Sequence, residues 1–221
     1  MRARYDLLLL SVLALALPAV AGAETSIPVG SFRSVAVHNG LQVVLRHGAE
    51  PGVKLVHGSP DCVRVAIEGA DRLVIERLVD KCPNVHDMVL EVTAPEIAAL
   101  SVSDGGTLRS QGEFPRQQAL QSAVANGGSL DVRALNADYV TAAVDNGGRI
   151  FARSDGSLLA TIAQGGIITY WGNAKVQSSI AHGGTVTRGR QADANKPLEA
   201  FDLAGPAPVA PVPPVPATTS Y

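Results

Sequence analysis

The stretch Leu158–Tyr170, LLATIAQGGIITY, places a pair of glycines between two short apolar runs. Glycine weakens a β-strand because it has no side chain to pack, so a pair of glycines there indicates a special backbone requirement. The arrangement occurs five times, at spacings of 22, 20, 18 and 18 residues, with pairs at Gly105-Gly106, Gly127-Gly128, Gly147-Gly148, Gly165-Gly166 and Gly183-Gly184. The sequence therefore predicts a repeat of about 20 residues.

Two positions of this repeat are apolar and branched in every copy. Three residues before the first glycine stand Val102, Val124, Val144, Ile162 and Ile180, and three after it stand Leu108, Leu130, Ile150, Ile168 and Val186. Further upstream, large and small residues alternate with mostly polar ones, which is the period of a half-buried strand and not of a helix. One copy is too short to bury its own apolar face, so the pattern predicts a parallel β-solenoid of stacked coils.

The glycine pairs are expected to be the structural turns between two strands of one coil. Such a turn needs a residue with positive φ, or a close approach of coils that a Cβ would prevent. The residues before the pairs should stack as a polar ladder at one corner; they are Asp104, Asn126, Asn146, Gln164 and His182. A meander of antiparallel hairpins is the alternative, since Asn-Gly also marks hairpin turns, but the recurrence of the same columns favours the solenoid.

The two ends of the chain differ from this middle part. Residues 1–23 read as a secretory signal peptide, with Arg2 and Arg4 before an apolar run and a small-x-small site at Ala21-Gly22-Ala23. An uncleaved membrane anchor is the alternative, although the run is shorter than the ~20 residues of a span and contains Pro18. Residues 191–221 are rich in proline and alanine and predict a disordered, extended tail. The part of the chain between these two ends, residues 24–190, is predicted to form a single β domain.

Charge and cysteine content restrict the function classes. Without residues 1–23 the chain has 16 basic and 19 acidic residues, which gives no electrostatic reason to expect nucleic acid as a partner. The two cysteines, Cys62 and Cys82, suggest one disulfide in an exported protein, because export leads to an oxidising compartment. A redox or metal pair is the alternative, but CxxC spacing and a flanking histidine pattern are both absent.

The succession of these segments resembles a known family. SFRSVAVHNGLQVVLRHG, then a strand-rich stretch ending in TAPEIAALSVSDGG, then repeated glycine-pair turns, is similar to the GIN domain of bacterial envelope proteins, over about residues 27–189. The family is known as a head domain of autotransporter adhesins. The resemblance implies a right-handed parallel β-helix, preceded by short strands of the same stack, and it supplies no catalytic residues. Members often have a Ser-Gly type of turn where this chain has Asp, Asn, Gln or His before Gly-Gly.

A search for catalytic and metal motifs gives little. A β-helical polysaccharide lyase or hydrolase would need carboxylates gathered on one face, whereas the charged residues of the repeats alternate in sign at different offsets from the glycines: Arg109, Asp131, Arg133, Arg149, Arg153 and Asp155. These charged residues are therefore interpreted as a face of the protein that is exposed to solvent. The five histidines are scattered without HxH or HExxH, and GxSxG and phosphate-loop motifs are absent. No catalytic residue, metal ligand or cofactor is predicted.

One weak binding feature remains. Phe151, Tyr170 and Trp171 follow successive glycine pairs, so adjacent coils could present them on one face to a sugar ring or a protein. The alternative is that these rings fill the interior or cover a loose end. The sequence thus predicts an exported, non-enzymatic envelope module for binding, adhesion or scaffolding, located in the periplasm or outer envelope of a bacterium. Its partner would be an envelope polysaccharide or protein. A polysaccharide-active enzyme and a homo-oligomer that assembles through the ends of the stack are the alternatives.

Overall fold

The computed structural model describes residues 25–84 and 87–196. The predicted signal peptide (1–23) and most of the predicted tail (197–221) lie outside the described residues. None of the described helices is long and apolar enough to cross a membrane.

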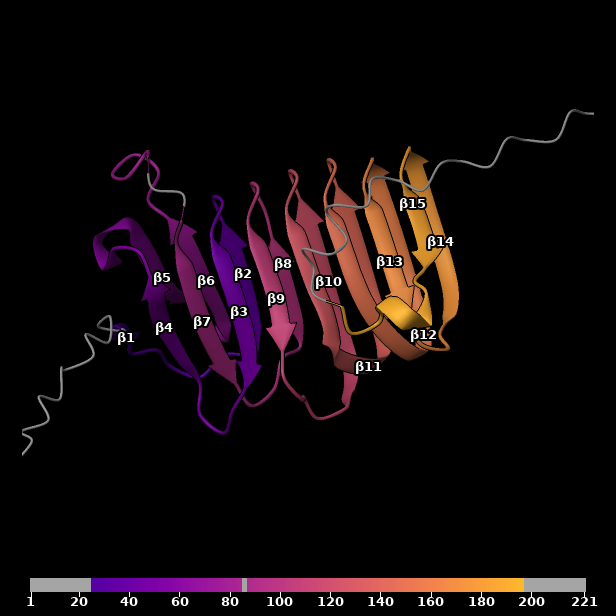
Figure 1. The fold of residues 1–221 in the computed structure, drawn as a ribbon, viewed down its shortest axis with the longest axis horizontal. Coiled ribbons are helices and arrows are strands. Elements are labelled where there is room, and N and C mark those ends of the chain that lie inside the picture. The colour runs from indigo at the N-terminus through magenta and orange to yellow at the C-terminus, as the bar shows by residue number, and fades with distance from the viewer. Residues whose placement is uncertain (1–24, 85–86, 197–221) are drawn as a thin grey trace, which may run out of the picture.

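The described chain is almost entirely β-strand (Figure 1). The first strands are β1 (Thr25–Ile27), β2 (Ser34–His38), β3 (Gln42–His47), β4 (Gly52–His57), β5 (Val63–Glu68), β6 (Arg72–Arg77), β7 (Val89–Ala94), β8 (Ala99–Val102) and β9 (Thr107–Gln111). The later ones are β10 (Gln117–Ala125), β11 (Ser129–Asp145), β12 (Arg149–Gln164), β13 (Ile167–Trp171), β14 (Lys175–His182) and β15 (Thr185–Arg188). Two short 3₁₀ turns, η1 (Pro60–Cys62) and η2 (Gln191–Asp193), complete the elements.

The prediction of a right-handed parallel β-helix is wrong. The described strands form one mixed 15-stranded sheet in which β1 pairs with β4, β4 with β7, and β5 with β6 in antiparallel fashion. The strand order also departs from the chain order, since β3 lies between β7 and β9, and β2 lies between β6 and β8. For β5 and β6 the physical reason is the short link Gly69–Asp71, because only antiparallel neighbours permit so short a connection.

From β8 onward the pairing is parallel, and the sheet folds around one apolar core in two layers. One layer contains β2, β8, β10, the second half of β11 and of β12, and β14; the other contains β3, β9, the first halves of β11 and β12, β13 and β15. The residues three before each glycine pair are successive Cα partners, as are those three after it. These two columns face each other across the core and are almost fully buried up to Ile162 and Ile168.

The glycine pairs sit at the turns between the layers and use two kinds of backbone. In the first three turns, Asp104, Asn126 and Asn146 adopt positive φ of 54°, 50° and 57°, and the glycine that follows each is also positive. In the last two turns both glycines have positive φ, at Gly165-Gly166 and Gly183-Gly184. Amide side chains link the first three turns: Asn126 Nδ2 donates to Asp104 Oδ1 (2.8 Å), and Asn146 Nδ2 donates to Asn126 Oδ1 (2.9 Å). The expected polar ladder is therefore seen over three of its five members.

The second glycine of a pair is needed for space. A Cβ on Gly148 would collide with the Val124 side chain of the preceding turn, and a Cβ on Gly128 would lie 3.0 Å from Val102 Cγ1. Close stacking of successive turns therefore requires the absence of a side chain at this position.

Candidate functional site

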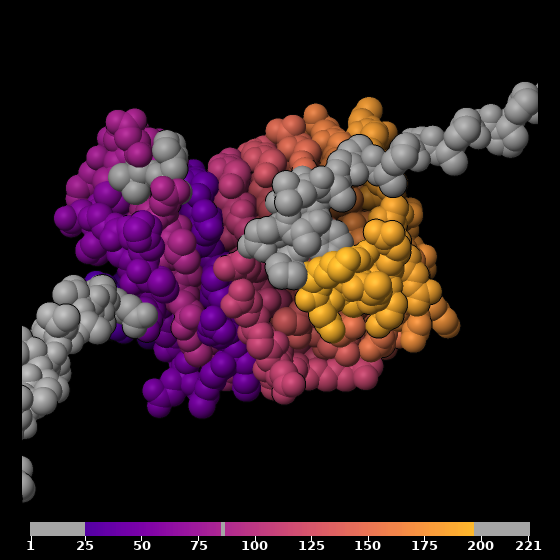
Figure 2. All heavy atoms as spheres, in the orientation of Figure 1, coloured from indigo at the N-terminus to yellow at the C-terminus, as the bar shows by residue number. Residues whose placement is uncertain are grey.

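The chain after β15 turns back across the outer surface of the sheet. Figures 1 and 2 show this segment, with η2, lying in front of the later strands. Trp171 Nε1 at the end of β13 donates to the Arg190 carbonyl (3.0 Å). Arg133 on β11 donates to the carbonyls of Asp193 (3.0 Å) and Lys196 (2.7 Å). We call residues 190–196 the strap, because these bonds tie them over the sheet.

A buried ion pair lies beneath the strap. Arg133 Nε and Nη2 donate to the two carboxylate oxygens of Asp131, at 2.8 and 2.5 Å, and the side chains are only 8% and 9% exposed. The Arg133 guanidinium also lies over the rings of Phe151, at 5.9 Å, and Trp171, at 5.1 Å. A buried guanidinium that is bidentately paired and stacked on rings is held in one orientation.

The strap has its own charge pairs. Asp193 accepts from Arg190 Nε (2.9 Å) and lies 2.7 Å from Lys196 Nζ. The hydrogen bond from Lys196, with the one from Arg190, holds the pKa of the Asp193 carboxyl below its usual value. The strap is thus fastened by its own ion pairs as well as by Arg133 and Trp171.

The three predicted binding aromatics do not form one exposed patch. Trp171 and Phe151 are 1% and 6% exposed, with ring centres 6.3 Å apart, and they pack with Ala194 of the strap. Tyr170 is half-buried and packs against the main core, because successive residues of a strand point to opposite faces. The structure therefore brings Phe151 and Trp171 together but covers both rings.

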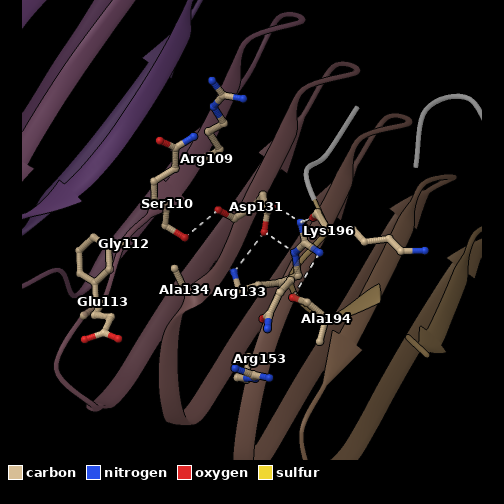
Figure 3. Close-up of a pocket in the computed structure, with 13 residues that line it drawn as sticks. Arg109, Ser110, Gly112, Glu113, Asp131, Arg133, Ala134, Arg153, Ala194 and Lys196 are labelled. Carbon is tan, nitrogen blue, oxygen red and sulfur yellow. Dashed lines mark hydrogen bonds and ion pairs between the residues drawn. The ribbon is translucent and has the colours of Figure 1, made fainter. Parts of the chain in front are cut away.

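Beside the strap lies a polar cleft of about 660 Å³ (Figure 3). Its floor is Asp131, Arg133 and Ala134 on β11, one wall is the loop 112–114, and the other is Ala194–Lys196 of the strap. Four cationic side chains and two carboxylates line it, namely Arg109, Arg133, Arg153 and Lys196 against Glu113 and Asp131. Phe114 supplies an aromatic ring. A cleft with an aromatic ring and convergent polar groups is suited to a polar ligand.

Sequence reasoning missed most of this cleft. It treated Arg109, Asp131, Arg133 and Arg153 as a solvated face, whereas Asp131 and Arg133 are buried and the other two line the cleft. Residues i and i+2 of a strand share a face, so the pattern Asp131-x-Arg133 was a usable signal for an ion pair. The covering strap could not be recognised, because residues 190–196 read RQADANK, a polar run with two alanines and no large apolar residue to indicate packing.

The disulfide between Cys62 and Cys82 is confirmed. The bond joins the end of η1 to the segment after β6, with the two Cα atoms 5.6 Å apart. It closes the end of the sheet that lies farthest from the strap, next to the β5–β6 hairpin. The described residues contain no free cysteine.

A serine, a histidine and an aspartate meet at the first glycine turn. His38 Nδ1 lies 2.7 Å from Ser103 Oγ, and Ser103 Oγ donates to Asp104 (2.5 Å), which lowers the pKa of that carboxyl. In a catalytic triad the acid orients the histidine and the histidine activates the serine. Here Asp104 accepts a hydrogen bond from Ser103 and does not orient His38, so the three residues are not arranged as a catalytic triad. Within residues 25–84 and 87–196, no group of three or more His, Cys, Asp or Glu residues could hold a metal ion.

The first part of the described sheet matches a known family of protein domains. The family model described as "Putative auto-transporter adhesin, head GIN domain" matches residues 31–119. The GIN resemblance is thereby confirmed over these residues. The matched GIN region runs from the segment before β2 to the start of β10 and includes the first glycine pair. The strap and the strands after β10 lie beyond it. No curated protein sequence matches the chain.

The chain also matches solved structures that are named as putative adhesins. A "putative adhesin" from Bacteroides fragilis NCTC 9343 is 15% identical, with a TM-score of 0.50 over 77% of this chain and 97% of that one. A "putative adhesin" from Parabacteroides distasonis ATCC 8503 is 12% identical, with a TM-score of 0.40 over 75% of this chain and 96% of that one. At 15% identity the Bacteroides structure shows a shared all-β fold and no more.

Proposed function

We propose that this chain is a non-enzymatic binding and adhesion module of the bacterial cell envelope, with a saccharide as its ligand in the cleft beside the strap. The observation that carries the proposal is the cleft itself, whose floor is held rigid by the Asp131–Arg133 ion pair. Saccharides are bound by convergent polar groups together with an aromatic surface, which Phe114 and the neighbouring guanidinium groups offer. The match to the GIN family model supports a role for an exported protein or a protein at the cell surface.

The charge of the cleft favours an acidic saccharide. The Asp131 carboxylate is paired with Arg133, and the Lys196 ammonium is paired with Asp193 of the strap. The lining as a whole carries four cationic side chains against two carboxylates, so the net charge of the cleft is positive. Guanidinium groups bind planar carboxylates in a bidentate manner, so a uronic or sialic type of sugar fits this lining better than a neutral one.

Binding without chemistry is favoured over hydrolysis. Glycoside hydrolases use two carboxylates on either side of the scissile bond, one as acid and the other as base or nucleophile. In this cleft each carboxylate oxygen of Asp131 accepts a hydrogen bond from the Arg133 guanidinium, and the Asp131 side chain is nine-tenths buried. With both of its oxygens occupied by the guanidinium, this carboxylate is blocked from contact with a substrate.

The test is a binding titration of the chain from Glu24 onward with acidic and neutral oligosaccharides. We expect saturable binding of acidic sugars that weakens at least tenfold in Arg153→Glu and is unchanged in Arg33→Glu, which alters an exposed arginine elsewhere. The bound sugar should be recovered intact by mass spectrometry. Cleaved sugar would replace the proposal with an enzyme, and equal effects of the two variants would remove the cleft as the site.

A further inference from the structure

The core of the two-layered stack is open at its last turn. In the column that precedes the glycine pairs, Val102, Val124 and Val144 are each 2% exposed and Ile162 is 0% exposed. The next member of the same column, Ile180 on β14, is 44% exposed. Ile180 points toward the core like its predecessors, and within residues 25–84 and 87–196 it is exposed because no further strand covers it.

The strand that carries Ile180 is also an unprotected edge. Among the described residues, β14 pairs only with β12, and β15 pairs only with β13. β14 is eight residues long, and its interior from Val176 to Ala181 has neither a charge nor a proline. Soluble proteins normally protect such edges with charged side chains, prolines, bulges or very short strands.

The opposite end of the sheet has those protections. One layer ends there with β1, which has only three residues. The other layer ends with β5, where Arg64 forms ion pairs with Glu68 and Glu76. A contact from β14 to this protected end of another molecule is disfavoured, which argues against an open head-to-tail filament.

The remaining tail of this chain is a poor cover for β14. The Lys196 carbonyl accepts a hydrogen bond from Arg133 on β11, which is separated from the edge strand β15 by three strand spacings, or ~15 Å. To reach β14, the chain after Lys196 would have to cover that distance and then cross to the other layer, a further ~10 Å. At ~3.5 Å per residue an extended chain needs about seven residues for this path, so it would reach β14 at about residue 203. Beyond that point the sequence has six prolines, which lack the N–H groups that pairing with an edge requires: Pro206, Pro208, Pro211, Pro213, Pro214 and Pro216.

We propose that a second copy of this chain covers the open end, in a two-fold dimer whose β14 strands pair antiparallel. A two-fold axis through Ser178, perpendicular to the layers, places Ser178 opposite the second copy's Ser178. The same register places Val176 opposite the second copy's Ile180, so the apolar residues at the open end face each other. In the other layer the axis passes near Arg188 at the end of β15, so only the ends of the two β15 strands meet there, and the contact closes on itself at two copies.

The mass of the full chain in solution, measured across a wide range of concentration, tests the dimer. We expect a dimer that dissociates on dilution and is lost in Ile180→Lys. Ile167→Lys is the matched control, because Ile167 is 39% exposed but lies on the outer surface of β13, away from the edge. A full chain that stays monomeric at every concentration, or a dimer that survives Ile180→Lys, would overturn the proposal.

A cross-link tests the register. Directly opposed residues of antiparallel strands have Cα atoms ~4.5–5.5 Å apart, within the span of a disulfide. Ser178→Cys should therefore give a covalent dimer under oxidation. Gln177→Cys should not, because the same register places Gln177 opposite the second copy's Ser179 and leaves the two Gln177 residues too far apart along the strands for a disulfide. Efficient cross-linking of both variants, or of neither, would contradict the two-fold axis through Ser178.

Discussion

The guanidinium carbon of Arg133 lies 5.1 Å from the centre of the Trp171 ring, although the two residues belong to different strands and 38 positions separate them. Arg133 binds Asp131 on one side and the carbonyls of the strap on the other, while Trp171 binds the Arg190 carbonyl. The same two side chains thus hold the strap, and Arg133 also forms part of the floor of the cleft. Because Trp171 is the single tryptophan of the chain, its fluorescence reports on this contact directly.

Removal of the Arg133 side chain should strongly destabilise the protein. Arg133→Ala leaves the buried Asp131 carboxylate without its partner and the strap carbonyls without a donor, which costs ~3–5 kcal/mol for a buried pair. Arg33→Ala is the control, since its ion pair with Glu96 is more than half exposed and should contribute less than ~1 kcal/mol. Urea unfolding followed by tryptophan emission measures both, and equal losses would show that the buried pair has no special role.

Acid should release the strap before it unfolds the sheet. The pKa of Asp193 is lowered in the folded state by Lys196 and Arg190, so the folded carboxyl binds its proton less readily than the unfolded one. Its stabilising contribution is present above the unfolded value, near 4, and is lost as the pH falls through the folded pKa. We expect the Trp171 emission to shift toward that of an exposed indole below about pH 4.

Far-UV circular dichroism over the same range separates release from unfolding, since the sheet signal should persist where the emission has already changed. Asp193→Asn removes the titrating group and should give an emission that no longer responds in this window. If Asp193→Asn titrates like the natural chain, another group controls the strap.

The sequence predicted this fold in part, and the successes and errors have different physical origins. The columns around Val124 and Leu130 were readable because a parallel stack repeats the same environment in each turn. The position of β3 between β7 and β9 was not, because it depends on pairing between strands far apart in the sequence. Phe151 and Trp171 were recognised as neighbours on one face, but their burial depends on the strap, whose composition gives no sign that it packs.

The turn residues should differ in their tolerance of alanine. Asn126 has a φ of 50°, where asparagine is tolerated but alanine is strained, so Asn126→Ala should cost ~1–2 kcal/mol. It also breaks the side-chain ladder to Asp104 and Asn146. Gln164 occupies the same place in a turn where the two glycines supply the positive φ, so Gln164→Ala should change stability by less than ~0.5 kcal/mol. Thermal unfolding of the two variants side by side would refute the distinction if their losses were equal.

Loss of the disulfide should destabilise the end of the sheet that carries the antiparallel strands. Cys62 and Cys82 are 20 positions apart, and a closed loop of this size is worth ~3 kcal/mol in the chain-entropy model. The double variant Cys62→Ala/Cys82→Ala should show this loss in urea unfolding, and amide exchange should rise first in β5 and β6, which the loop contains. The exchange of β12 and the Trp171 emission should stay as in the natural chain at low urea, because the strap and its ion pair lie at the other end of the sheet. A simultaneous rise of exchange throughout the sheet would instead show that the disulfide supports the fold as one cooperative unit.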